Sequence, residues 1–260
     1  MTPTSLFSAP DSTAAFSAPD AFLAGARRVA IHQPNLFPRL TTLAKLWAAD
    51  CWVVLDNVQF ARRDYQHRAR LAALTDPGMR QWLSLATHLP EGQPTLIGDA
   101  LLADPARSQR RVGQLLQQLY GRSRHWPLFQ ERLGPLLSLF NTTDRLAAIS
   151  EASTLILLRL LGWRGQIMSS SDLPARLGRS RRLADLAKAC GARTYLCGTG
   201  GMRYLAVDAF TRQGIHVTAF RTPSEGVWAS AREVSAVRAL MVLGPKVLAR
   251  ELSAVAVAQS

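Results

Sequence analysis

Three polar side chains follow a short apolar run near the start of the chain. The run Val29 to Ile31 predicts a buried strand, and His32, Gln33, Pro34 and Asn35 come directly after it. Histidine can act as a general base or contact a phosphate, and the two amides can polarise a carbonyl group. Ligands of open α/β sheets bind beyond the carboxyl ends of the strands. We therefore expect a site here; a loop whose side chains satisfy backbone groups is the alternative.

A second predicted strand ends on a carboxylate. Trp52 to Leu55 is a continuous apolar run that Asp56 follows, and Leu40 to Asp50, before it, has helix composition. Strand, helix and strand this closely spaced predict a βαβ unit with parallel neighbouring strands and a right-handed crossover. The His32 and Asp56 loops then share one edge of the sheet. Asp56 can hold a cation, orient an amine or act as a base, and an ion pair with an arginine is the alternative.

Two later loops also follow predicted strands. Gly165 to Met168 precedes Ser170 and Asp172, which can bind a ligand or cap a helix. Thr194 to Cys197 precedes Gly198-Thr199-Gly200-Gly201, whose backbone N–H groups can contact an anion; a tight structural turn is the alternative. The glycine spacing matches neither the dinucleotide fingerprint nor the Walker A loop, so neither motif is predicted.

The remaining pattern predicts a Rossmann-like, mainly parallel sheet in a single α/β domain over residues 27–260. Further strands are expected over 81–85 and 215–220, with a long irregular loop over 87–104 that has room for one short strand. Helices are expected over 106–120, 126–140, 143–161, 180–190, 202–213 and 231–258, the last broken near Gly244. The first three form a helical insertion at about 105–163, and the last is a helical C-terminal tail. Residues 1–26 are rich in Ala, Ser and Pro, which predicts a disordered arm.

The charge balance indicates an anionic ligand. The chain carries 31 basic and 18 acidic residues, a formal net charge of +13, and only three of the basic residues are lysines. Arginine binds phosphates and carboxylates bidentately, so we expect a small anionic or nucleotide-linked substrate. A nucleic acid such as tRNA is the alternative partner. The arginines occur as scattered pairs rather than one basic run, which favours the small molecule.

Cysteine and histidine spacing predicts no metal site. The three cysteines, Cys51, Cys190 and Cys197, include no Cys-x-x-Cys pair, and we expect them to be reduced and buried. His67 and Arg68 lie in a charged stretch and are expected to be exposed, with His67 a bystander and Arg68 a phosphate contact. No apolar run is long enough to span a bilayer, and no secretory signal is evident, so a cytoplasmic protein is expected. Oligomeric state is not determined by these patterns.

Five blocks, in this order along the chain, resemble the WbqC-like protein family. They are His32 to Pro38, Val54 to Phe60, Trp82-Leu83, Ser170 to Leu173, and Tyr195 to Gly198 with Gly201 and Tyr204. The chain departs from the family at Gln66 to Arg70, where asparagines usually flank the arginine, and at Cys197, where serine is common.

Members of this family occur in bacterial gene clusters for O-antigen and related polysaccharides. The resemblance implies an acyl- or aminoacyltransferase, possibly a glycine transferase, acting on an amine of a nucleotide-linked sugar. His32 and Asp56 are then the expected catalytic residues. The expected substrate contacts are Gln33, Asn35, Gln59, Arg68, Ser170, Asp172, Gly198, Gly200, Gly201 and Tyr204.

Two other functions fit the pattern. A histidine loop after the first strand of a parallel sheet is similar to ATP-using adenylating enzymes of the pantothenate-synthetase type, which makes ATP a candidate cofactor. Their second histidine is absent, because residue 35 is Asn. The other alternative is a non-catalytic module that binds RNA. Polar residues gather at strand ends rather than on an aromatic and basic platform, which favours the enzyme.

Overall fold

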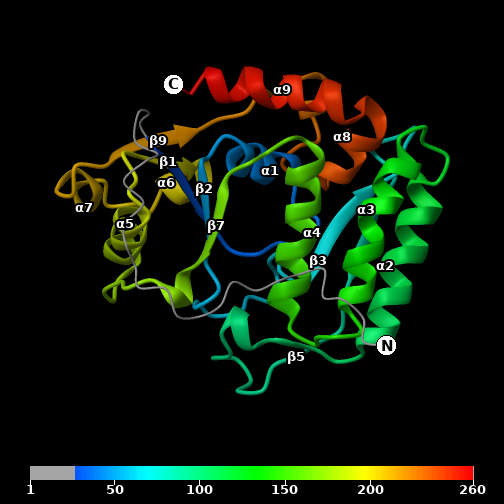
Figure 1. The fold of residues 1–260 in the computed structure, drawn as a ribbon, viewed down its shortest axis with the longest axis horizontal. Coiled ribbons are helices and arrows are strands. Elements are labelled where there is room, and N and C mark those ends of the chain that lie inside the picture. The colour runs from blue at the N-terminus through cyan, green and yellow to red at the C-terminus, as the bar shows by residue number, and fades with distance from the viewer. Residues whose placement is uncertain (1–26, 260) are drawn as a thin grey trace, which may run out of the picture.

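Five parallel strands form the central sheet of the computed structural model, which describes residues 27–259 (Figure 1). Their bounds are β1 Arg28–His32, β2 Cys51–Val54, β7 Gln166–Ser169, β8 Thr194–Gly198 and β9 His216–Phe220. Their spatial order, β7-β2-β1-β8-β9, is that of doubly wound sheets. The predicted Rossmann-like α/β fold is therefore confirmed. The arm predicted over residues 1–26 lies outside the described residues.

The predicted βαβ unit is present at the start of the domain. Helix α1 (Leu40–Trp47) connects β1 to β2, and these strands are parallel neighbours with His32 beside Val54. Strand β2 also pairs with β7, so that Val54 lies beside Ser169. The carboxyl ends of the three strands therefore meet at one edge of the sheet, as the sequence predicts for the His32 and Asp56 loops.

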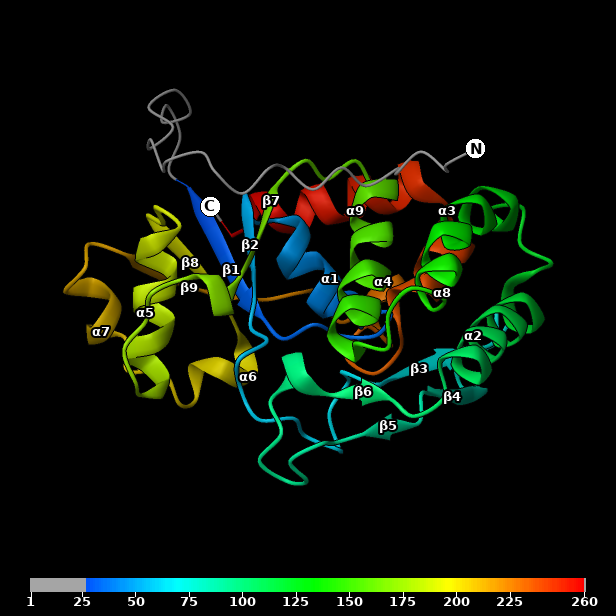
Figure 2. The same cartoon turned by 60° about the horizontal axis from the view of Figure 1, so that its bottom comes forward.

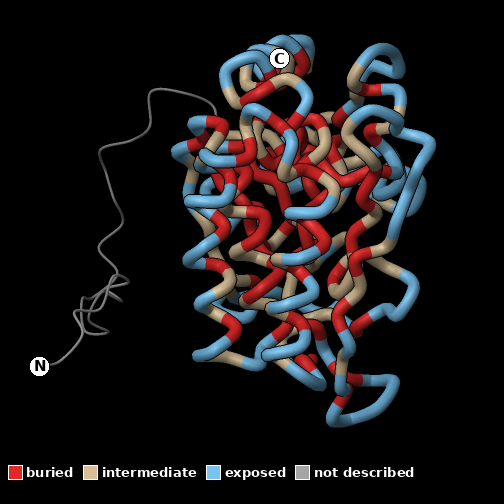
Figure 3. Tube along the Cα trace, turned by 90° about the vertical axis from the view of Figure 1, so that its right-hand side faces the viewer, coloured by how far each residue is buried: buried red, intermediate tan, exposed pale blue. Residues whose placement is uncertain are grey.

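Helices cover both faces of this sheet (Figure 2). Ala30 and Trp52 pack into a core with α1, α4, α8 and α9, whereas Val29 and Val53 pack into a second core with α5 and α7. The helix bounds are α4 Leu146–Leu160, α5 Arg179–Ala189, α7 Asp208–Thr211, α8 Ala236–Leu243 and α9 Pro245–Val257. Burial on both faces explains the uninterrupted apolar strands. Buried residues run through the centre of the molecule in Figure 3, and exposed residues lie along its outer loops.

The insertion and the tail are helical where the sequence predicts helices. Helices α2 (Pro105–Tyr120), α3 (Trp126–Leu139) and α4 lie between β6 (Leu101–Leu102) and β7 in the chain. Asp104 caps α2 by accepting a hydrogen bond from the backbone N–H of Arg107 at 2.8 Å. The tail breaks at Gly244, whose φ of +79° suits glycine, so that α8 and α9 are separate helices.

The strand predicted over residues 81–85 forms, but it does not belong to the parallel sheet. Strand β4 (Arg80–Ser84) pairs antiparallel with β3 (Arg68–Ala72), a strand that the sequence did not predict. The guanidinium groups of Arg68 and Arg70 lie 4.5 and 4.7 Å from the centre of the Trp82 ring. This stacking accommodates charged residues in a strand and explains why the segment looked like a charged loop.

Two further corrections concern shorter segments. The loop expected over 87–104 contains a second small sheet of β5 (Thr87–His88) and β6 (Leu101–Leu102). The helix expected over 202–213 is replaced by two short helices, α6 (Thr199–Met202) and α7. The backbone N–H of Ala206 donates to the hydroxyl of Ser180 in α5 at 3.0 Å, so a tertiary hydrogen bond interrupts the helical ladder.

Candidate active site at the carboxyl edge of the sheet

Helix α4 fixes the loop that follows β1. The hydroxyls of Ser153 and Thr154 donate to the carbonyl of Asn35 at 3.3 and 2.9 Å, and the backbone N–H of Phe37 donates to the Ser153 hydroxyl at 2.8 Å. Phe37 has a φ of +41°, which is rare for a residue other than glycine. A buried, strained loop that shares three hydrogen bonds with one helix is typical of a functional site.

His32 is half-buried and has hydrogen-bonding neighbours at both ring nitrogens. Its Nε2 lies 3.0 Å from Asn35 Oδ1, and its Nδ1 lies 3.5 Å from Nζ of Lys45 in α1. An amide oxygen can only accept, so Nε2 carries the proton and Nδ1 is the acceptor. Burial lowers the pKa of His32 well below its usual value, and the charges of Lys45 and Arg39 lower it further. The ring is therefore neutral at physiological pH.

The ladder of backbone hydrogen bonds between β1 and β8 has a gap, and Lys45 lies beside it. These two strands pair only through Arg28 and Val29, although both extend three residues further. The carbonyl of Ile31, which a continuous ladder would satisfy, instead accepts a hydrogen bond from Lys45 Nζ at 3.2 Å. Burial lowers the pKa of Lys45 to about 8. This gap in the ladder lies where the strand order reverses, the position at which sheets of this kind usually bind ligands.

Asp56 is held by the loop after β7. Its Oδ1 accepts from the Ser170 hydroxyl and the Ser171 backbone N–H at 2.8 and 3.2 Å, and its Oδ2 accepts from the hydroxyls of Ser169 and Ser171 at 2.7 Å each. Burial raises the pKa of Asp56, but the three serine side chains outweigh this effect and place it below the ordinary value. Asp56 is therefore a fixed negative charge at the edge of the sheet.

Glu151 is a second carboxylate at this edge. It is half-buried on α4, next to Ser150, whose hydroxyl donates to the carbonyl of Gln66 at 2.6 Å. Among the described residues, no cation pairs with Glu151. Burial raises its pKa, and the negative charge of Asp56 raises it further. The edge thus combines a carboxylate that stays ionised with one that binds a proton more readily than usual.

The structure brings part of the predicted site together. Gln33 accepts a hydrogen bond from Gln66 Nε2 at 2.7 Å, and Ser170 bonds directly to Asp56. Asp172 is exposed at the end of the same serine loop. Gly198, Gly200 and Gly201 span the end of β8 and short helix α6, next to the gap beside β1.

The other three predicted substrate contacts are exposed to solvent or already hydrogen-bonded within the protein. Gln59 is exposed and donates to the carbonyl of Gln93 at 2.9 Å, and Tyr204 is 69 % exposed. Arg68 is half-buried rather than exposed, because its guanidinium stacks on Trp82 and donates to the carbonyl of Asp64 at 3.0 Å. Their roles as substrate contacts stay predictions.

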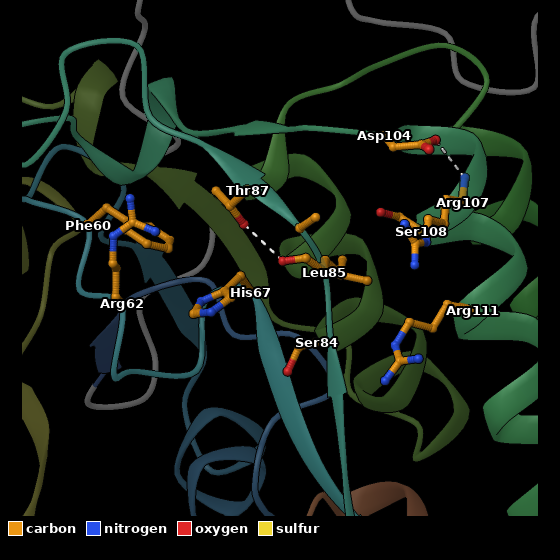
Figure 4. A pocket seen from close by; sticks show the side chains of 11 residues that line it. Phe60, Arg62, His67, Ser84, Leu85, Thr87, Asp104, Arg107, Ser108 and Arg111 are labelled. Atoms are coloured by element: carbon orange, nitrogen blue, oxygen red, sulfur yellow. Dashed lines mark hydrogen bonds between the residues drawn. The ribbon is translucent and has the colours of Figure 1, made fainter.

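A cavity of about 500 Å³ lies between the β4–β5 segment and α2 (Figure 4). Arg62, Arg107 and Arg111 line it, together with His67. His67 was expected to be an exposed bystander, but it is half-buried and its ring packs against Phe60 at a centroid distance of 5.3 Å. Burial, with the charges of Arg68 and Arg62, lowers the pKa of His67 to about 4.

Sequence reasoning missed four features of this site: Lys45, Glu151, the hydroxyls of α4, and the arginines of α2. Lys45 is one of three lysines in the chain and lies among apolar residues of a helix. Glu151 is the only acidic residue of α4, and Ser150, Ser153 and Thr154 form one stripe at helical spacing. A polar or charged residue within an otherwise apolar helix is the sequence feature from which these groups could have been predicted.

The three cysteines are free and buried, as predicted. Among residues 27–259, no group of three or more His, Cys, Asp or Glu side chains is arranged to hold a metal ion. Within that same part of the chain, no helix combines the length and apolar character required to cross a membrane.

The fold defines a doubly wound α/β protein, and the side chains of the edge site, His32, Lys45, Asp56 and Glu151, gather at the carboxyl edge of its sheet. The chain belongs to the WbqC-like protein family, whose model matches residues 33–247. It is 24 % identical, over 196 residues, to an uncharacterised protein of Mycobacterium tuberculosis, Rv1507c. That match covers 75 % of this chain and 82 % of the relative. No solved structure matches the chain.

Proposed function

We propose that this protein transfers an acyl or aminoacyl group, glycyl among them, to an amine of a nucleotide-linked sugar or related metabolite in polysaccharide or O-antigen-type biosynthesis. Membership of the WbqC-like family supports this class of reaction. The observation that carries the proposal is the pair of carboxylates Asp56 and Glu151, whose pKa values shift in opposite directions at one edge of the sheet. Two neighbouring carboxyl groups whose pKa values shift in opposite directions are typical of sites where one group stays ionised and the other transfers a proton.

The acceptor amine must lose a proton to attack a carbonyl carbon. Asp56 has all its hydrogen-bonding positions engaged by the serine loop, so it acts through its charge and attracts the cationic amine. Glu151, with no cationic partner among the described residues and a raised pKa, accepts the proton. The neutral amine then attacks and the new C–N bond forms. The bond between the carbonyl carbon and the leaving group breaks, and the leaving group departs with the electron pair and takes up the second proton of the nitrogen.

The β1 loop supplies the groups that act on the carbonyl oxygen. The amides of Gln33 and Asn35 stand next to His32, which burial keeps neutral and able to accept a proton. Lys45 provides a buried positive charge behind this loop, where negative charge on the carbonyl oxygen is stabilised electrostatically. His32 and Asp56 are thus the catalytic residues of the proposal, and Glu151 is added to them.

The test is an N-acylation assay followed by mass spectrometry. Nucleoside-diphosphate amino sugars serve as acceptors, and glycyl thioester, glycyl-tRNA, or glycine with ATP serve as donors. We expect His32→Ala, Asp56→Ala and Glu151→Gln each to lower kcat by about 10²–10⁴-fold, the usual contribution of acid–base catalysis. Glu131→Gln, at an exposed position of α3, is the matched control and retains activity.

A pH profile separates the role of Glu151 from a structural one. A base acts when deprotonated, so kcat/KM of the wild type falls with decreasing pH through a pKa above the ordinary glutamate value. This limb disappears in Glu151→Gln. Near-wild-type turnover of both His32→Ala and Asp56→Ala, or no acylated product from any pair of substrates, would refute the proposed function.

A further inference from the structure

The cavity between the β4–β5 segment and α2 has positively charged side chains on two walls. In Figure 4, Arg62 and His67 lie on one side and Arg107 and Arg111 on the other, with Leu85 between them. The first pair belongs to the segment that leads into β3, and the second pair to the first two turns of α2. The polar groups of two distant segments therefore converge on one space of about 500 Å³.

These arginines have no acidic partner among the described residues. The ion pairs of that part of the chain involve other arginines, and Asp104, the acidic residue that lines the cavity, accepts the backbone N–H of Arg107 as the cap of α2. Three guanidinium groups without counter-charge in one cavity favour a ligand with more than one negative charge. Leu85 and Ala86 add apolar surface for a non-ionic part.

A buried polar atom also points to a missing partner. His67 Nδ1 is buried and has no hydrogen-bond partner within residues 27–259. A neutral imidazole can donate one hydrogen bond and accept another, so the His67 ring, which lines the cavity, has one hydrogen-bonding position that the protein does not use. The neighbouring Arg68 is not free to contact a ligand in the cavity, because its guanidinium donates to the carbonyls of Arg63 and Asp64.

The cavity and the edge site share one stretch of backbone. Gln66 precedes His67, and its amide donates to Gln33 in the β1 loop at 2.7 Å. Its carbonyl accepts the hydroxyl of Ser150, the residue before Glu151. A ligand held beside His67 therefore lies one residue along the chain from groups that contact the edge site.

We propose that this cavity binds the diphosphate of a nucleoside diphosphate, with Arg62, Arg107 and Arg111 on the phosphate oxygens. The inference rests on the proposed function, because it supplies the anchor for a nucleotide-linked substrate whose reacting amine reaches the carboxyl edge of the sheet. The cavity volume lies within the range of about 300–1,000 Å³ that small-molecule sites occupy. A cavity of this size fits a small nucleotide better than a polymer.

Calorimetry on the full chain tests the proposal with uridine, adenosine, guanosine, cytidine and thymidine diphosphates, and with inorganic diphosphate. We expect at least one nucleoside diphosphate to bind more tightly than inorganic diphosphate. Arg107→Gln and Arg111→Gln each weaken this binding about tenfold or more. Arg110→Gln, at an exposed neighbour on α2 outside this cavity, and Arg250→Gln on α9 change it less than about twofold. Circular dichroism verifies that each variant is folded.

Three results would overturn the proposal. They are no binding by any nucleoside diphosphate, equal weakening by all four arginine substitutions, and preferential binding of tRNA with a steep salt dependence to which all four arginines contribute. Because the measurement is of binding, it is independent of the acyl-transfer assay. Nucleotide binding without N-acylation would refute the proposed function alone, and N-acylation unaffected by Arg107→Gln and Arg111→Gln would refute this inference alone.

Discussion

Replacing Lys45 by methionine should remove a distinct pH dependence from the stability of this protein. Lys45 is 6 % exposed, and Nζ donates to the Ile31 carbonyl in the gap between β1 and β8. Burial lowers the lysine pKa from 10.5 to about 8 in the folded state, whereas the unfolded chain has the ordinary value. Methionine preserves the length of the side chain and removes its charge.

The size of the effect follows from the pKa difference. Each pKa unit corresponds to about 1.4 kcal/mol, so the shift to about 8 amounts to about 3 kcal/mol. Below pH 8, Lys45 is protonated in both states and the folded state bears the full cost of the buried charge. Between about pH 8 and pH 10.5, only the unfolded state keeps the proton, so stability rises with pH in this window.

The assay is urea unfolding of the wild type and of Lys45→Met at intervals from pH 7 to pH 10.5. The variant also loses the hydrogen bond to Ile31. This loss costs about 1 kcal/mol and lowers the free energy of unfolding of the variant by the same amount at every pH. We expect the wild type to gain up to about 3 kcal/mol relative to the variant as pH rises from 8 to 10.5. Lys246→Met, at an exposed position of α9, should follow the wild-type curve. Parallel curves for the wild type and Lys45→Met would refute the burial argument.

Three further substitutions test other parts of the site and fold by chemical denaturation. Asp56→Asn should lower stability at pH 7, and its difference from the wild type should shrink below about pH 4, because the lowered pKa of Asp56 stabilises the fold only while the carboxylate is ionised. Ser153→Ala should cost about 1–3 kcal/mol, because the buried N–H of Phe37 loses its acceptor; Ser153→Thr should lose less. Gly244→Ala should cost about 1–2 kcal/mol, because φ is +79° and a Cβ would lie 2.4 Å from the His125 ring; an unchanged midpoint would contradict this.

The sequence by itself determined the scaffold and one edge of the site. The apolar runs at 29–31 and 52–55, with a helix between them, were sufficient to place His32 and Asp56 beyond neighbouring parallel strands. The same reasoning placed the serine and glycine loops after β7 and β8. These features are predictable because strand periodicity and the handedness of βαβ units depend on short stretches of chain.

The tertiary structure alone decided what those residues can do. Asp56 is an ionised, fully hydrogen-bonded group because serines more than 110 positions away surround it. Lys45 is a buried cation because β1 and β8 separate at their carboxyl ends, and Glu151 acquires a raised pKa only where α4 packs near Asp56. Burial and pKa are sums over contacts between distant segments, and no local pattern of residues encodes them.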